Sequence, residues 1–299
     1  GEWLGITERR PNMAEVGRGN HERLARQFGV GRLHGVNEVL ERKSLPVVGL
    51  AVVGRRVVDG GGEDLAVSPP VVAAEAVLYP GDLQLDQVLA LVIESILERG
   101  DEVWALDDLS TGRLSNISHL LDHPRFHFIE GTVLDAPLSQ KLVDQVDQVF
   151  HLAASVGVRY VVENPLTSLK NNIHGAEIIL DAATRRLTPV VLFSSSEVYG
   201  KGHGGPLQEE DDRILGPTCY SRWGYAASKS VDEFLALAYH REHGLPIRLV
   251  RCFNTCGPRQ VGSYGMVIPR FVEQALDGRS LSIYGDGTQS RCFSFVGDV

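Results

Sequence analysis

Strand-like and helix-like segments alternate from about residue 87 to residue 299, and this alternation constrains the fold more than any other feature. The strand-like segments are near-continuous runs of Val, Leu, Ile and Phe, which is typical of strands buried on both faces of a parallel sheet. They are 102–107, 126–133, 149–154, 190–196 and 247–253, and the helix-like segments are 88–99, 138–146, 168–184 and 225–243. The pattern predicts an α/β fold with a doubly wound parallel sheet.

Residues 1–76 have a different character, because the stretch 45–73 is rich in Val, Gly and Arg but has neither a helical nor a strand period. Breaks follow at 60–64 (GGGED) and 68–70 (SPP). We interpret residues 1–76 as an atypical extension, non-native or disordered, with a genuine extra domain as the alternative. Residues 77–254 are then the expected nucleotide-binding domain, and residues 255–299 the start of a further lobe.

Tyr225 and Lys229 form the strongest chemical motif, Tyr-Ala-Ala-Ser-Lys, at the start of the predicted helix 225–243. Their i, i+4 spacing places both side chains on one face of the helix. An ammonium group beside a phenol favours the phenolate, so the pair suits removal of a proton from a substrate hydroxyl. Ser195 lies in the serine run that ends strand 190–196, where open α/β sheets bind ligands, and its hydroxyl can hold the reacting oxygen.

The charge and composition exclude several classes of function. The net charge is −9 and the pI is near 5.6, which argues against a nucleic-acid partner. No apolar run reaches the ~18 residues of a membrane helix, so we expect no membrane partner. The four cysteines lack the spacing of a zinc site, so we expect no metal and reduced thiols in a cytoplasmic protein.

Five segments in order resemble the NAD-dependent epimerase/dehydratase family of extended short-chain dehydrogenases/reductases: VLFSSSEVYG, SRWGYAASKS, RCFNTCGPRQ, YGMVIPRFV and YGDGTQSRCFSFVGDV. The resemblance covers roughly residues 90–299. It implies a Rossmann-like NAD domain, a small C-terminal lobe that holds a UDP-sugar or another nucleotide sugar, and oxidation at sugar C4 to a 4-keto intermediate. It also implies a homodimer formed by helices 168–184 and 225–243.

The resemblance assigns roles to individual residues. Ser195 matches the catalytic Ser/Thr, Tyr225 the base, and Lys229 its partner, which also binds the nicotinamide ribose. Glu197 matches an acidic residue that decarboxylases and dehydratases use after oxidation and that 4-epimerases commonly lack. Asn254 resembles the asparagine that holds the substrate diphosphate. Arg291 resembles the arginine that contacts the same phosphates or, in decarboxylases, the reacting sugar. The resemblance does not separate epimerase, decarboxylase and dehydratase.

The expected NAD contacts begin with Asp107, which ends strand 102–107. A carboxylate there can accept both adenosine ribose hydroxyls and repels a 2′-phosphate, which favours NAD over NADP. The family resemblance adds Thr132 and Val133 beside the adenine, the run Leu152, Ala153 and Ala154 at the end of the fourth strand, and Asn172.

The chain departs from the family at the glycine-rich turn, which should lie near residues 82–90, ~20 residues before the ribose-binding acid. Leu83, Asp86 and Leu89 stand at the three expected glycine positions, where side chains keep backbone N–H groups from the pyrophosphate. Two explanations are open: the chain before residue 90 is not the native reading, or the protein is a non-catalytic relative. We favour the first and expect a fragment, truncated at both ends.

Overall fold

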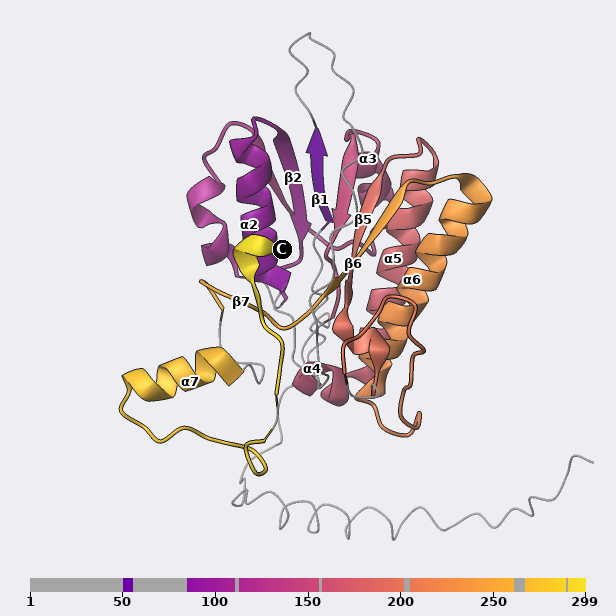
Figure 1. The fold of residues 1–299 in the computed structure, drawn as a ribbon. Helices are drawn as coiled ribbons and strands as arrows, with labels where there is room; N and C mark the ends of the chain where they lie inside the picture. The colour runs from indigo at the N-terminus through magenta and orange to yellow at the C-terminus, as the bar shows by residue number, and fades with distance from the viewer. Residues whose placement is uncertain are drawn as a thin grey trace, which may run out of the picture. The chain divides into compact units, whose positions relative to one another are not determined.

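The computed structural model describes residues 51–55, 85–110, 113–155, 158–201, 205–260, 267–288 and 290–299. A six-stranded sheet of order β3-β2-β1-β4-β5-β6 forms the centre (Figure 1). Its strands are β1 (Ala51–Arg55), β2 (Glu102–Asp107), β3 (Phe126–Glu130), β4 (Gln148–His151), β5 (Val190–Ser195) and β6 (Ile247–Cys252). This is the strand order of the Rossmann fold, so the predicted fold class is confirmed.

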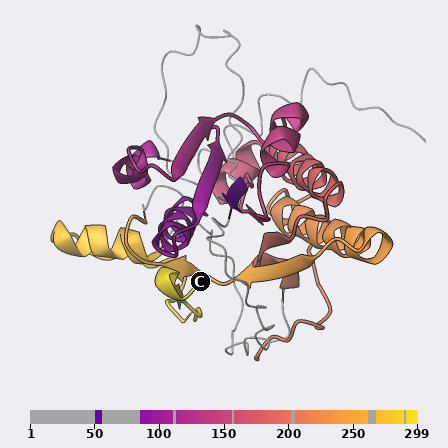
Figure 2. The same ribbon diagram turned by 90° about the horizontal axis from the view of Figure 1, so that it is seen from above.

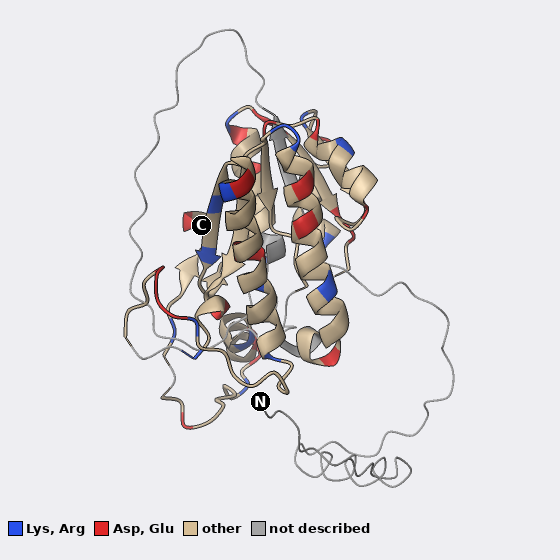
Figure 3. Cartoon of the chain, turned by 90° about the vertical axis from the view of Figure 1, so that its right-hand side faces the viewer, with Lys and Arg blue, Asp and Glu red and all other residues tan. Residues whose placement is uncertain are grey.

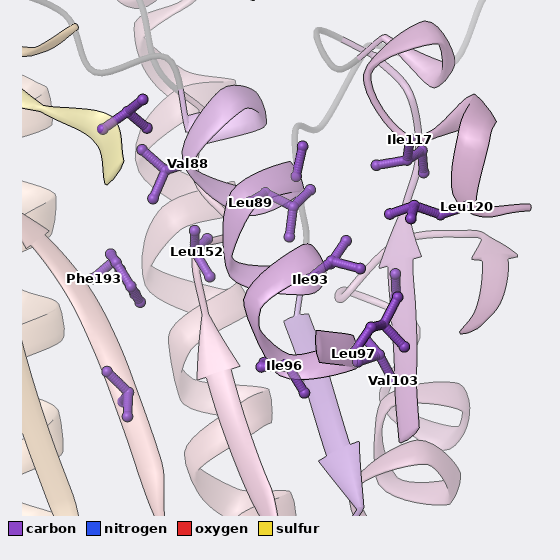
Figure 4. Packing of buried hydrophobic residues seen from close by; sticks show 14 of the residues in the cluster. Val88, Leu89, Ile93, Ile96, Leu97, Val103, Ile117, Leu120, Leu152 and Phe193 are labelled. Atoms are coloured by element: carbon purple, nitrogen blue, oxygen red, sulfur yellow. The ribbon is translucent and has the colours of Figure 1, made fainter. Parts of the chain in front are cut away.

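Helices cover both faces of the sheet (Figure 2). The helix α2 (Leu85–Glu98) packs on one face, where the apolar core also includes Val103 and Ala105 of β2 and Phe193 of β5 (Figure 4). The helices α3 (Ala136–Val143), α5 (Pro165–Thr184) and α6 (Trp223–His243) pack on the other face, against Leu106, Val149 and Leu192. Successive strand residues alternate between the two cores, as the period of a strand requires.

Local chemistry sets the ends of these helices. Asp135 caps α3 by accepting a hydrogen bond from the Leu138 N–H at 3.0 Å. Gly244 ends α6 with a left-handed backbone, φ 73°, and its N–H donates to the carbonyl of His240 at 2.9 Å. The bounds of α5 and α6 lie within a few residues of the predicted segments 168–184 and 225–243.

Smaller elements follow the sheet strands at their carboxyl ends. The helix α4 (Val158–Glu163) lies between β4 and α5, and the 3₁₀ helix η3 (Ser196–Tyr199) continues directly from β5. Beyond β6, the strands β7 (Thr255–Cys256) and β8 (Ser294–Phe295) form a parallel pair, and the helix α7 (Val267–Leu276) lies between them in sequence. None of the described helices is long and apolar enough to cross a membrane.

The central strand β1 runs in the opposite direction to its neighbours, a departure from the predicted parallel sheet. Ala51 pairs with Leu106 of β2 and with His151 of β4, whereas Arg55 pairs with Glu102 at the start of β2. Figure 1 shows the β1 arrow pointing against the arrows of the other strands. The strand belongs to the expected extension 1–76, yet it occupies the middle of the sheet. The rest of that extension lies outside the described residues.

The helix α6 presents apolar side chains outward and charged side chains inward. Val231 and Phe234 are exposed, Phe234 by 66%. Figure 3 looks onto this side of the molecule, where α5 and α6 run side by side and much of their length carries no charge. The inner face instead holds Lys229, Asp232 and Glu233, all at most 1% exposed.

Candidate active site

The predicted site residues lie at one edge of the sheet. Asp107 ends β2, the run 152–154 follows β4, Ser195 ends β5, and Asn254 follows β6 shortly before β7. These four strands point the same way, because β2 and β4 both run against β1 while β4, β5 and β6 are mutually parallel. Their carboxyl ends therefore meet at the edge where open α/β sheets bind ligands.

Strand alternation places Ser195 and Tyr225 on the same side of the sheet. Val191 and Phe193 belong to the core beneath α2, and Ser195 is the next residue of β5 on that side. Tyr225, in the first turn of α6, packs against the same core. The sequence-predicted hydroxyl and phenol are thus directed to one side of the ligand edge.

Glu197 lies in η3, the turn that follows Ser195. The Ser195 hydroxyl accepts a hydrogen bond from the Glu197 N–H at 3.2 Å, so Ser195 caps the turn that carries Glu197. The turn closes at Gly200, where φ is 69° and an added Cβ would lie 2.2 Å from the carbonyl oxygen of Ile214. Only glycine fits there, because both the backbone conformation and the space exclude a side chain.

Lys229 is completely buried, and its ammonium lies 3.3 Å from the Asp232 carboxylate one turn further along α6. His151, at the end of β4, is also completely buried, and neither ring nitrogen has a hydrogen-bond partner within the described part of the chain. Burial, together with the charge of Lys229, lowers the pKa of His151 to about 3, so the imidazole is neutral at pH 7.

Sequence reasoning missed the buried polar residues behind the catalytic set. Besides Asp232 and His151 these are Ser194 and Glu233, and the partly buried Arg251 lies beside them; they come from the ends of β4, β5 and β6 and the inner face of α6. One signal was available. The Asp-Glu pair at 232–233 follows Lys229 at i+3 and i+4, so it continues the catalytic face of the helix.

The residues expected around the adenosine lie together at the ends of β2 and β3. Asp107 is buried, and its Oδ1 accepts a hydrogen bond from the Leu109 N–H at 2.7 Å. The Thr132 hydroxyl accepts from the Leu134 N–H at 3.3 Å, and the buried Val133 side chain lies against Gly175 of α5. Leu152, Ala153 and Ala154 are all buried.

Asn172 joins three elements through its amide. Its Oδ1 accepts from the Ser155 N–H at 2.6 Å, and its Nδ2 donates to the Ser155 carbonyl at 3.4 Å and to the Ser228 hydroxyl at 3.0 Å. The residue is 1% exposed, so these bonds fix the loop after β4 against α5 and α6. The geometry gives Asn172 a structural task beside the predicted cofactor contact.

The two predicted diphosphate contacts come from segments that pair in the C-terminal part. Asn254 donates from Nδ2 to the carbonyl of Cys292 at 2.7 Å, and Thr255 and Cys256 pair with Ser294 and Phe295. Arg291 donates to the carbonyl of Ser290 at 2.6 Å. The structure thus brings the segments of Asn254 and Arg291 side by side after β6.

The profile of the NAD dependent epimerase/dehydratase family matches residues 90–299, which include every predicted site residue. The chain belongs to this family. It is 41% identical over 207 residues to UDP-N-acetyl-alpha-D-glucosaminuronate decarboxylase of Bacillus cytotoxicus, which is 69% of this chain and 63% of that protein. It is 36% identical over 208 residues to UDP-glucuronic acid decarboxylase 1 of Arabidopsis thaliana, covering 70% of this chain and 46% of that protein.

Solved structures of the family have the same fold. A double mutant of dTDP-glucose 4,6-dehydratase from Streptomyces venezuelae, solved with NAD bound, matches with a TM-score of 0.64 and 30% identity. The match covers 71% of this chain and 66% of that one. The chain therefore spans about half to two thirds of the length of these relatives.

The epimerase/dehydratase family is named for NAD, and the described residues fit this dinucleotide only in part. Asp107 stands where a ribose-binding acid is needed, at the end of β2. The predicted catalytic residues Ser195, Tyr225 and Lys229 belong to β5 and α6. A pyrophosphate site needs a strand that ends at the ligand edge and turns into a helix N-terminus. Here β1 begins at that edge with Ala51 and ends at the opposite edge with Arg55, and residues 56–84 separate it from α2.

The residues at the expected glycine positions also fail to fit a pyrophosphate site. Leu89 stands at one expected glycine position and is 4% exposed in the core beneath α2 (Figure 4). Asp86 lies in the first turn of α2, and Leu83 lies outside the described residues. The described residues therefore do not form the family's pyrophosphate-binding turn. They also contain no group of three His, Cys, Asp or Glu side chains placed to hold a metal ion.

Proposed function

We propose that the chain carries the catalytic part of an NAD-dependent nucleotide-sugar epimerase, dehydratase or decarboxylase. The observation that carries the proposal is the convergence of Ser195, Glu197, Tyr225 and Lys229 at one end of the sheet. Relatives named as UDP-sugar decarboxylases support a UDP-sugar as the substrate class. In the oxidation at sugar C4 that the resemblance implies, NAD is the hydride acceptor.

The chain's own residues have distinct tasks at the sugar. The Tyr225 phenolate oxygen accepts the proton of the reacting hydroxyl, and the positive charge of Lys229 in the next turn favours that phenolate. The Ser195 hydroxyl donates a hydrogen bond to the same sugar oxygen. Glu197 lies on the turn capped by Ser195, and its carboxylate is the proposed acid or base at the neighbouring carbon after oxidation.

A second function is a nucleotide-sugar-binding protein without catalytic activity, and the reversed strand β1 favours it. Without a strand-to-helix turn at the ligand edge, the described part of the chain lacks the backbone N–H groups that hold a dinucleotide pyrophosphate. The proposed substrate contacts Asn254 and Arg291 lie beyond β6 and do not depend on that turn.

Calorimetric titration of the purified chain with NAD, together with assay of nucleotide released on denaturation, separates the two functions. Tight NAD binding would support the enzyme and would mean that other residues rebuild the phosphate site. Stabilisation by UDP-glucuronate with no response to NAD would support the binding protein. Failure of both ligands to bind would reject both functions.

We further propose a homodimer in which α5 and α6 of each subunit pack together. Val231 and Phe234 of α6 and Leu166 of α5 are exposed large apolar side chains on these two neighbouring helices. A helix that exposes apolar side chains while it buries charged ones is typical of an interface. The area around these residues is therefore the surface on which a second copy would dock.

A further inference from the structure

Glu233 is a buried carboxylate that the catalytic set does not use. It is 1% exposed, and its Oε1 accepts hydrogen bonds from the Ser194 hydroxyl at 2.5 Å and from Arg251 Nε at 3.0 Å. Its Oε2 accepts from Arg251 Nη2 at 2.9 Å and also from Arg213. One carboxylate thus joins β5, β6, α6 and the segment before Ile214.

Sheet register explains why these groups meet. Ser194 of β5 and Arg251 of β6 are paired residues in neighbouring strands. Ser194 follows Leu192, and Arg251 follows Leu249, on the side of the sheet that faces α6. Glu233 is on the inner face of that helix, so it reaches both side chains at once.

The bonds continue from Glu233 into the turn that carries Glu197. Arg251 Nη1 donates to the Tyr199 hydroxyl at 2.8 Å, and the guanidinium lies 4.8 Å from the centre of the Tyr199 ring. Tyr199 is the last residue of η3. Arg213 gives a second connection between Glu233 and this turn. It donates to Glu233, and the next residue, Ile214, donates its N–H to the Tyr199 carbonyl at 3.3 Å.

Glu233 is charged in this setting. Burial alone would raise its pKa, but hydrogen bonds from Arg251 and Ser194 and the charges of Arg251 and Arg213 outweigh burial and bring the pKa below its usual value. A charged, fully bonded carboxylate holds its partners in fixed positions, because each bond lost leaves a buried polar group unsatisfied.

We propose that Glu233 and Arg251 are positioning residues that fix the turn bearing Ser195 and Glu197 against the sugar. The bond from Ser194 to Glu233 anchors the residue before Ser195, and the bond from Arg251 to Tyr199 anchors the end of η3 beyond Glu197. The inference rests on the proposed function, because it assigns Ser195 and Glu197 to the sugar and leaves the nucleotide to the C-terminal segments.

Three variants test the proposal. Glu233→Gln removes the charge and keeps the shape, and Tyr199→Phe removes only the hydroxyl that accepts a hydrogen bond from Arg251 Nη1. Tyr239→Phe is the matched control. It also removes a tyrosine hydroxyl, but this hydroxyl lies further along α6 and donates to Asp181 of α5. The first readout is the affinity for UDP-glucuronate against the affinity for UDP. The second is hydrogen–deuterium exchange of the amides of residues 195–200.

We expect Glu233→Gln to weaken UDP-glucuronate about tenfold, the loss of roughly one positioned hydrogen bond, and to leave UDP unchanged. Exchange at 195–200 should quicken in Glu233→Gln and Tyr199→Phe but not in Tyr239→Phe. Equal weakening of both ligands, or exchange that is unchanged or quickens throughout the sheet, would overturn the proposal. If Glu233→Gln does not fold, Tyr199→Phe decides by the same readouts.

The two readouts also separate this inference from the proposed function. If the wild-type chain binds neither ligand, the proposed function fails, and exchange at 195–200 still decides whether Glu233 and Arg251 fix the turn. If UDP-glucuronate binds but its affinity does not respond to Glu233→Gln or Tyr199→Phe, the positioning role fails while the proposed function stands.

Discussion

The Lys229 ammonium and the Asp232 carboxylate lie 3.3 Å apart on successive turns of α6, and both side chains are at most 1% exposed. Neither group has another hydrogen-bond partner within the described residues. Each charge therefore depends on the other, because an isolated charge is strongly disfavoured in a dry interior. Lys229, the proposed partner of the catalytic base, therefore has a counter-ion before any ligand arrives.

Removal of that counter-ion should destabilise the fold. Asp232→Asn keeps the shape of the side chain but leaves the Lys229 charge uncompensated. We expect a loss of about 3–5 kcal/mol in the free energy of unfolding, the usual cost of breaking a buried pair from one side. Urea denaturation at pH 7 measures it, with Tyr239→Phe as a control on the same helix.

The double variant Asp232→Asn/Lys229→Met provides the internal check on this prediction. It removes both charges, and replacement of a whole buried pair by neutral side chains is often close to neutral. The double variant should therefore be more stable than Asp232→Asn alone. Equal or lower stability of the double variant would contradict the role of Asp232 as counter-ion.

His151 should make the protein sensitive to acid. Its pKa falls from 6.5 to about 3 in the folded state, with burial as the main cause. Below pH 6.5 the unfolded chain binds a proton that the folded chain does not, so stability falls as the pH is lowered toward 3. The slope from this residue approaches about 1.4 kcal/mol per pH unit between pH 6 and 4.

The variant His151→Leu isolates this contribution from the carboxylates. The two side chains have similar volumes, and the imidazole has no hydrogen bond to lose within the described residues. At pH 7 the variant should match the wild type within about 1.5 kcal/mol. Denaturation curves from pH 7 to pH 4 should then show a smaller loss of stability in the variant, and parallel losses would refute the assignment.

Tyr225→Phe tests the proposed base. Without the phenol oxygen no group accepts the proton of the sugar hydroxyl, so turnover of UDP-glucuronate should fall by at least about 10²–10⁴-fold. Binding of UDP-glucuronate, measured by calorimetry, should stay close to wild type. Tyr239→Phe makes the same chemical change on the same helix and should retain turnover. Comparable turnover in Tyr225→Phe and the wild type would exclude the mechanism.

The sequence was sufficient to predict the ligand edge. Ser195 and Asp107 end apolar segments, and parallel strands bring such ends together wherever the segments are correctly recognised. The bounds of β2 and of β5 agree with the predicted segments to within one residue. The buried charges on α6 were harder to predict, because periodicity identifies an apolar stripe but does not say whether it faces the core or a partner.

The direction of β1 could not be predicted from the sequence at all. The stretch around Ala51–Arg55 has no clear strand period, and a strand buried among others forms its ladder in either direction with the same backbone groups. The sequence did indicate that the pyrophosphate-binding turn is missing near residues 82–90, because Leu83, Asp86 and Leu89 stand at the expected glycine positions. The reversed direction of β1 agrees with this, because β1 does not end at the ligand edge, where such a turn would begin.

The exposed stripe on α6 gives a prediction about assembly. Val231→Lys and Phe234→Lys each place a charge in the surface proposed to dock a second copy, and a buried unpaired charge opposes association. We expect light scattering after size exclusion to show a dimer for the wild type and a monomer for both variants. Val231 is the cleaner position, because Phe234 also lies 5.3 Å from the Arg213 guanidinium.

Leu121→Lys is the matched control for this surface. Leu121 is 42% exposed and precedes β3, at the opposite edge of the sheet from β6, so a charge there should leave the dimer intact. A wild-type chain that is monomeric at all concentrations would refute the docking surface. So would a dimer that resists both α6 variants, because the apolar stripe would then be exposed for another reason, such as contact with a different partner.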